Sequence, residues 1–183
     1  INMWKKNVFL LITLIFIGFK GVNILANNIF EINVTNIDGE DVPMSNFKGN
    51  VLLVVNTASK CGFTKQYKSL EKVYNKYKQK GFIILAFPSN DFRQELSSNE
   101  EVKEFCEGYK ISFPIFAKGK VKGFGKQKIF KYLTEDINGK SIGEIRWNFE
   151  KFIITRKGKL FKRFRSSIDP NQIEITRSIE SLL

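Results

Sequence analysis

The segment Val51–Asn56, with the sequence VLLVVN, decides the fold class because it is a nearly continuous apolar run of strand length. Runs of this kind are typical of strands whose sheet is covered on both faces. A second such run, Phe82–Phe87 (FIILAF), ends at Pro88. Between the two, residues 64–80 place apolar side chains at helical spacing, and Gly81 then stops the helix. The order strand, helix, strand predicts an α/β fold.

Two β-hairpins are predicted on either side of this unit. Residues 29–35 have the pattern of a strand, and the turn signal Asp38-Gly39 follows before a second short strand. Near the carboxyl end, residues 149–155 and 160–164 flank a basic, glycine-containing turn. The chain is therefore expected to contain an N-terminal β-hairpin and a partly antiparallel sheet.

Two further helices are predicted in the second half of the chain. Ser98 and Glu101 have the spacing of a capping box, which opens a helix that runs to Tyr109. Pro170 is expected to begin a last helix. These elements together predict a central mixed sheet with helices on both faces.

The length of 183 residues allows one domain and at most a short appendage. The chain contains no histidine, which excludes Ser-His-Asp and Cys-His nucleophile pairs and His-based zinc sites. Its two cysteines are too few for a four-thiolate zinc site or a disulfide framework. We therefore expect no metal and no cofactor, and chemistry that depends on thiols, carboxylates, hydroxyls, amides, indoles or lysines.

The formal charge of +12 raises the question of a nucleic-acid partner. The basic residues are spread along the chain and interleaved with acidic ones, which favours ordinary solvation over nucleic-acid binding. A basic binding module stays as the less favoured alternative, because cationic and aromatic residues alternate near the second hairpin. These residues are Arg156, Lys157, Lys159, Phe161, Lys162, Arg163, Phe164 and Arg165.

The amino-terminal residues resemble a secretory signal peptide. Lys5 and Lys6 precede an uncharged, apolar run from Val8 to Phe19, and Lys20 interrupts the run too early for a stable membrane span. We expect residues 1–26 to be a targeting segment and residues 27–183 to form a single domain. The destination is then the secretory pathway or an organelle reached through it, or the cytosol if the segment is not used.

Cys61 is the stronger candidate for a reactive group. It follows the buried strand by a short polar loop and precedes the predicted helix, so its sulfur is expected near unpaired backbone N–H groups and the positive end of a helix dipole. Lys60 and Lys65 add positive charge on either side. These features favour a thiolate, whereas the alternative is a buried structural cysteine.

Cys106 has a different setting. It shares a face of the predicted helix with Val102, Phe105 and Tyr109, which alone would make it a core side chain. The two cysteines are separated by 45 residues, so there is no Cys-x-x-Cys motif. The spacing does not decide whether they come within disulfide reach.

From residue 29 to the carboxyl terminus, the sequence resembles the glutathione peroxidase family, with motifs in matching order and spacing. The motifs are Asn56–Thr64 (NTASKCGFT), Leu85–Phe92 (LAFPSNDF) followed by Gln94-Glu95, Phe113-Pro114, and Ile145–Phe152 (IRWNFEKF). The resemblance implies a thioredoxin-like fold and a peroxidase.

The resemblance also assigns the site. It implies that Cys61 is the reactive residue and that Gln94, Trp147 and Asn148 complete the catalytic set. Indole and amide N–H groups are neutral donors that can hold a thiolate and peroxide oxygens. Cys106 matches the resolving cysteine of the thioredoxin-dependent branch, which reverses its interpretation as a core side chain.

Three departures from the family pattern have consequences. Position 61 is cysteine and not selenocysteine, which should lower intrinsic reactivity. Only Arg93 separates Phe92 from Gln94, where members usually carry two residues, and position 89 is serine where many have a non-essential cysteine. The segment between residues 134 and 145 is short, as in members without the oligomerisation insert, so a monomer is expected.

The resulting hypothesis is that Cys61 reduces hydrogen peroxide or an organic hydroperoxide and becomes a sulfenic acid. Cys106 then forms a disulfide with it, and thioredoxin (or glutathione) is the reductant. Because Cys106 lies on a predicted helix, that helix should unwind locally. The alternative within redox chemistry is a thiol–disulfide relay or peroxide sensor that oxidises a client protein.

Overall fold

The computed structural model describes residues 28–135 and 143–183. The predicted targeting segment, residues 1–26, and its boundary with the domain lie outside the described residues. Within the two described ranges, no helix is both long enough and apolar enough to cross a membrane.

A four-stranded mixed sheet forms the centre of the fold, in the order β4-β3-β5-β6. In this sheet β3 and β4 are parallel to each other, and β5 is antiparallel to both of its neighbours, β3 and β6. Their bounds are β3 (Val51–Thr57), β4 (Phe82–Pro88), β5 (Lys151–Ile154) and β6 (Leu160–Phe164). The strands near residues 51, 82, 149 and 160 are thus confirmed.

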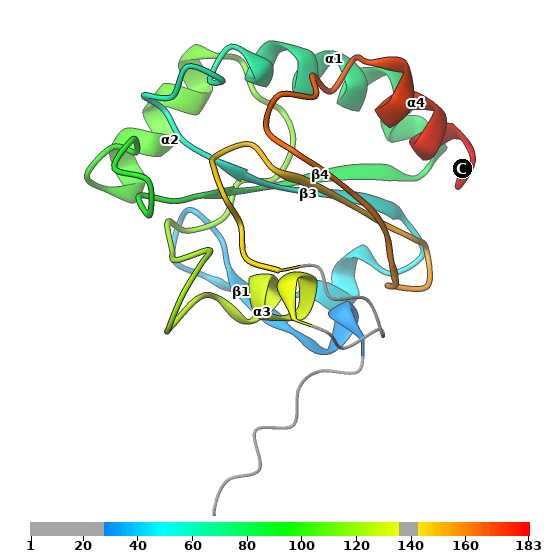
Figure 1. Ribbon diagram of the computed structural model, residues 1–183, viewed down its shortest axis with the longest axis horizontal. Coiled ribbons are helices and arrows are strands. Elements are labelled where there is room, and N and C mark those ends of the chain that lie inside the picture. Colours follow the sequence, from blue (N-terminus) through cyan, green and yellow to red (C-terminus); the bar gives the residue numbers. More distant parts are fainter. Residues whose placement is uncertain (1–27, 136–142) are drawn as a thin grey trace, which may run out of the picture.

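Helices cover both faces of this sheet, as predicted (Figure 1). On one face lie α1 (Gln66–Tyr77), α2 (Asn99–Gly108) and α4 (Ile173–Glu180). On the other lies α3 (Lys128–Thr134), together with the N-terminal hairpin. The hairpin pairs β1 (Asn33–Thr35) with β2 (Asp41–Pro43) in antiparallel register. Three short 3-10 helices, Ile29–Glu31, Met44–Phe47 and Lys78–Lys80, complete the elements of the described part of the chain.

The continuous apolar run of β3 is explained by the two cores that it serves. Val51, Leu53 and Val55 pack in the core beneath α1, α2 and α4. The alternate residues Leu52 and Val54 pack in the core on the opposite face, toward α3 and the hairpin. Both faces of the strand are therefore buried, and no polar alternation is required.

Several predicted boundaries shift for local reasons. The first residues of the expected strand 29–35 form a 3-10 turn, because Asn28 Oδ1 accepts the Phe30 N–H. The helix expected from residue 64 begins at Gln66, since Thr64 is used in the preceding turn. The last helix begins at Ile173 and not at Pro170.

Candidate active site

The Cys61 loop joins the end of β3 to the start of α1 and is fixed by its own side chains. The Cys61 N–H donates to Thr64 Oγ1 at 2.9 Å, and that hydroxyl donates to the Ala58 carbonyl at 2.8 Å. The Phe63 N–H donates to Cys61 Sγ at 3.4 Å. The sulfur therefore receives a backbone N–H just before α1, as the sequence suggested.

The Cys61 side chain lies at the edge of the core and not deep inside it. The residue is 8% exposed, and its neighbours Lys60 and Gly62 are exposed. It nevertheless packs with the apolar core beneath α1 and α2. The sulfur thus has apolar groups on one side and a polar, solvent-facing loop on the other.

Gln94 and Asn148 come together beside this loop. Asn148 Nδ2 donates to Gln94 Oε1 at 3.0 Å, and the Lys60 N–H donates to the Gln94 carbonyl at 2.8 Å. Arg93, the single residue between Phe92 and Gln94, has a φ of 58° in the left-handed region, which accommodates this short connection. One amide of the predicted catalytic set is therefore bonded directly to the other, next to Lys60.

Trp147 stands on the same segment as Asn148. The residue is 41% exposed, and its indole ring packs on Phe92 with ring centroids 5.1 Å apart. Its carbonyl accepts the Asn56 side-chain amide at 3.0 Å. The indole is thus placed at the surface, and its backbone is tied to the end of β3 that leads into the Cys61 loop.

Asn56 is a site residue that the sequence analysis did not single out for a role. Its Oδ1 accepts the Glu150 N–H at 2.9 Å, and its carbonyl accepts the Phe149 N–H at 2.6 Å. Phe149 has a φ of 62°, so the chain turns sharply after Asn148. Asn56 thereby clamps the Trp147–Glu150 segment against β3.

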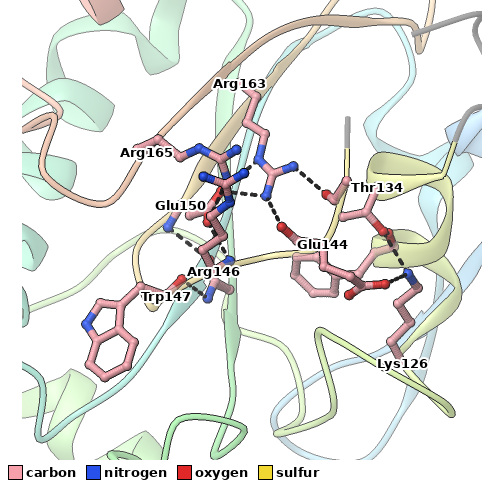
Figure 2. Close-up of polar contacts among 11 residues, drawn as sticks. Lys126, Thr134, Glu144, Arg146, Trp147, Glu150, Arg163 and Arg165 are labelled. Carbon is pink, nitrogen blue, oxygen red and sulfur yellow. Dashed lines mark hydrogen bonds and ion pairs between the residues drawn. The ribbon is translucent and has the colours of Figure 1, made fainter. Parts of the chain in front are cut away.

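Glu150 holds the same segment from the other side, at the centre of an arginine cluster (Figure 2). Its buried carboxylate forms ion pairs with the guanidinium groups of Arg163 at 2.7 Å and Arg165 at 2.9 Å. It also accepts a hydrogen bond from the backbone N–H of Arg146 at 2.7 Å. Burial lowers the pKa of Arg163, and the Glu150 charge opposes that shift. In Figure 2 the Trp147 indole points away from this cluster.

Lys151, the residue after Glu150, is fully buried. Its Nζ donates to the carbonyls of Ser166 at 3.2 Å and Ile168 at 2.6 Å. The Ser166 carbonyl also accepts Gln66 Nε2 at 2.8 Å, at the first residue of α1. Burial lowers the pKa of Lys151 to about 7.

Cys106 lies on the buried face of α2, as the helical spacing predicted. It is 1% exposed, and its Sγ is 3.8 Å from the Tyr67 hydroxyl. Burial raises the pKa of its thiol to about 11. The Cys106 thiol is therefore protonated near neutral pH. Both cysteines are free, and they belong to the same apolar core.

Among residues 28–135 and 143–183, no three His, Cys, Asp or Glu side chains are grouped as metal ligands.

Comparison with known proteins agrees with this geometry. A model of the glutathione peroxidase family matches residues 29–134. The chain belongs to the glutathione peroxidase family. The glutathione peroxidase-like peroxiredoxin gpx1 of Schizosaccharomyces pombe is 47% identical over 148 residues, which are 80% of this chain and 92% of that protein.

Two further similarities extend this result. The hydroperoxy fatty acid reductase gpx1 of Synechocystis is 42% identical over an alignment of 165 positions that covers 86% of this chain and 96% of that protein. The crystal structure of Trgpx in apo form has a TM-score of 0.70 and 36% identity, covering 86% of this chain and 96% of that one. The glutathione peroxidase described here is thus an enzyme that reduces peroxide, with the expected thioredoxin-like fold.

Proposed function

We propose that this glutathione peroxidase works as a two-cysteine, thioredoxin-recycled enzyme. The Cys61 thiolate attacks the terminal oxygen of a hydroperoxide, the O–O bond breaks, and a sulfenic acid and an alcohol or water are formed. The Cys106 thiol then displaces the sulfenic oxygen as water and forms a disulfide. A thioredoxin dithiol reduces that disulfide by exchange.

The amide pair beside the loop is the observation that carries the first step. The Gln94 and Asn148 side chains are bonded to each other, and the Gln94 carbonyl is bonded to Lys60, the neighbour of Cys61. Neutral amide and indole donors can stabilise a developing alkoxide without taking up the proton. We assign Gln94, Asn148 and the Trp147 indole this role.

The position of Cys106 supports the second step. It shares a core with Cys61, yet it lies inside α2 with a protonated thiol. Attack on the sulfenic acid therefore requires local unwinding of α2. The similarity to a relative named hydroperoxy fatty acid reductase supports organic hydroperoxides, besides hydrogen peroxide, as substrates of this enzyme.

The arginines of the second hairpin support the absence of a nucleic-acid partner. Arg156 donates to the carbonyls of Gly49, Lys80 and Leu183, and Arg163 and Arg165 bind Glu150. These cations are therefore committed to contacts within the fold.

The test is peroxide consumption by stopped flow, with thioredoxin and glutathione supplied in parallel. Cys61→Ser should consume peroxide at least about a thousandfold more slowly than the wild type, since the nucleophile is gone. Cys106→Ser should react once with peroxide and then stall with thioredoxin. Retained activity in Cys61→Ser, or steady thioredoxin-dependent turnover in Cys106→Ser, would contradict the assignment.

A further inference from the structure

Glu95 is a buried carboxyl group for which the mechanism above has no use. It is 6% exposed, and its Oε1 accepts the N–H groups of Ser59 at 3.0 Å and Leu96 at 2.8 Å. Its Oε2 is buried and makes no hydrogen bond of regular geometry to any described residue, although the adjacent Ser59 hydroxyl is close enough to lower the pKa of the carboxyl group. A buried carboxylate whose second oxygen lacks a regular hydrogen bond is costly, so its retention calls for an explanation.

The carboxyl group is coupled to the resolving cysteine. The Glu95 charge raises the pKa of the Cys106 thiol and of Tyr67, although burial has the larger effect on both. Tyr67 in turn contacts the Cys106 sulfur through its hydroxyl. The next residue, Leu96, packs against the apolar core that contains Cys61, Tyr67 and Cys106. Glu95 thus lies at the edge of that core, and it touches the Cys61 loop through Ser59.

The resolving reaction needs a proton carrier. When the Cys106 sulfur bonds to the Cys61 sulfur, the S–H bond of Cys106 and the S–O bond of Cys61 both break. The proton released by Cys106 must reach the leaving oxygen for water to form. The chain has no histidine to perform this transfer.

We propose that Glu95 carries this proton, accepting it from the Cys106 thiol at Oε2 and passing it to the oxygen that leaves Cys61. The inference rests on the two-cysteine mechanism proposed above. The electrons of the S–H bond form the new disulfide, and no external oxidant is needed beyond the peroxide already consumed.

The attachment of Glu95 explains how it can act although α2 must move. Its Oε1 is bonded to the backbone of Ser59, two residues before Cys61, so the carboxyl group stays with the loop when α2 unwinds. The preceding residue, Gln94, is bonded to Lys60. Cys106 thus moves toward a sulfur that belongs to the Cys61 loop and a carboxylate that is bonded to that loop.

The protonation state of Glu95 depends on its surroundings. Burial raises its pKa above the usual value, whereas the Ser59 and Leu96 donors and the Lys118 charge lower it. Above that pKa the carboxylate is ready to accept a proton. The wild-type rate of disulfide formation should therefore rise through the carboxyl titration and then become nearly independent of pH.

The experiment is a single turnover of the full chain with one equivalent of hydrogen peroxide. Samples are quenched in acid, alkylated, and analysed by mass spectrometry for sulfenic acid and for the Cys61–Cys106 disulfide. In Glu95→Gln, which keeps an acceptor for Ser59, sulfenic acid should form within about twofold of the wild-type rate. Disulfide formation should slow on the order of 100-fold near neutral pH.

The pH profile separates proton transfer from a structural role. Without the carboxylate, only spontaneously ionised Cys106 can react, so the rate in Glu95→Gln should rise about tenfold per pH unit. The difference from wild type should therefore shrink as pH rises. The matched control is Glu104→Gln, an exposed carboxyl on α2, which should change neither step.

Other outcomes would overturn the inference in distinguishable ways. Unchanged disulfide formation in Glu95→Gln, equal slowing of both steps, or a pH-independent difference would refute proton transfer and leave the two-cysteine mechanism standing. If the wild type forms no Cys61–Cys106 disulfide, both proposals fail. If Glu95→Gln does not fold, a wild-type profile that rises without a carboxyl inflection would refute the role of Glu95.

Discussion

The two cysteines belong to one apolar core, yet the regions that hold them are built differently. The Cys61 loop is fixed by buried side-chain hydrogen bonds, from Thr64 within the loop and from Glu95 outside it, and Asn56 at the base of the loop bonds the distant Glu150. Helix α2, which carries Cys106, is held at its start by Ser98 and by an exposed ion pair from Lys103. One sulfur is therefore positioned in advance, whereas in the proposed mechanism the other reacts only after part of its helix unwinds.

Removal of the Asn56 clamp should have the largest effect on this contrast. Asn56→Ala leaves the Glu150 N–H and the Trp147 carbonyl without their partner, and each such loss costs about 1–3 kcal/mol. We expect the free energy of unfolding to fall by about 3 kcal/mol in urea titrations. The peroxide step should slow more than disulfide formation.

The matched control for this change is Asn50→Ala. Asn50 makes a local hydrogen bond to Phe47 at 3.3 Å, so its removal should cost less than about 1 kcal/mol. An equal fall in the free energy of unfolding in the two variants would show that the Asn56 hydrogen bonds stabilise the fold no more than the local Asn50 bond does.

Lys151, next to Glu150, should make the stability of the fold depend on pH. Its folded pKa of about 7 lies below the ordinary value of 10.5, so the unfolded chain binds more protons between these values. Below about pH 7 the amine is charged in the folded protein, so burial lowers the free energy of unfolding by its full amount. This loss of stability disappears as pH rises and the buried amine loses its proton. Relative to Lys151→Met, the wild type should gain about 1 kcal/mol of stability per pH unit from pH 7 to 9.

Urea titrations of both proteins across this range test the prediction. The difference between them isolates Lys151 from the other groups that titrate at alkaline pH. A constant difference from pH 7 to 9 would contradict a lowered pKa for this amine.

Fraying of α2 should act on Cys106 alone. Ser98 Oγ caps the helix by accepting the Glu101 N–H at 3.2 Å, and loss of such a cap costs about 1 kcal/mol. If unwinding precedes attack, Ser98→Ala should form the disulfide about fivefold faster while the peroxide step is unchanged. Ser97→Ala serves as the control. A slower or unchanged disulfide step in rapid-quench measurements would argue against unwinding.

The smallest effect is expected from the ion pair between the hairpin turn and α2. Lys103 Nζ lies 2.7 Å from Asp38, but the two side chains are 47% and 52% exposed, and such pairs contribute less than about 1 kcal/mol. Asp38→Asn should speed disulfide formation by about twofold at low salt. The effect should vanish at high ionic strength, and its persistence there would exclude an electrostatic cause.

Features that depend on local pattern were predictable from the sequence. The buried strands β3 and β4 follow from apolar runs, and α2 follows from its cap and its helical spacing. One local detail differs, because the Glu101 carboxylate accepts the Ser97 N–H beside the cap residue. Helix α3 was missed because it is short and lacks a side-chain cap.

Some site residues could likewise be predicted from local sequence motifs, whereas others could not. The motifs identified Gln94 and Asn148, and the structure brings them into contact. The roles of Asn56 and Glu150 were not predictable, because their partners lie far away in sequence. Asn56, for example, bonds residues 91 and 94 positions further along the chain. Buried polar pairs of this kind follow from the tertiary fold and leave no periodic signal.

The half-exposed indole on Phe92 gives the enzyme its own optical reporter. The chain has two tryptophans, so a Trp4→Phe variant would keep Trp147 as the sole indole fluorophore. Because its backbone is tied to the strand that leads into the Cys61 loop, its emission should follow each oxidation state of the sulfur in real time. The catalytic cycle could then be recorded without any added dye.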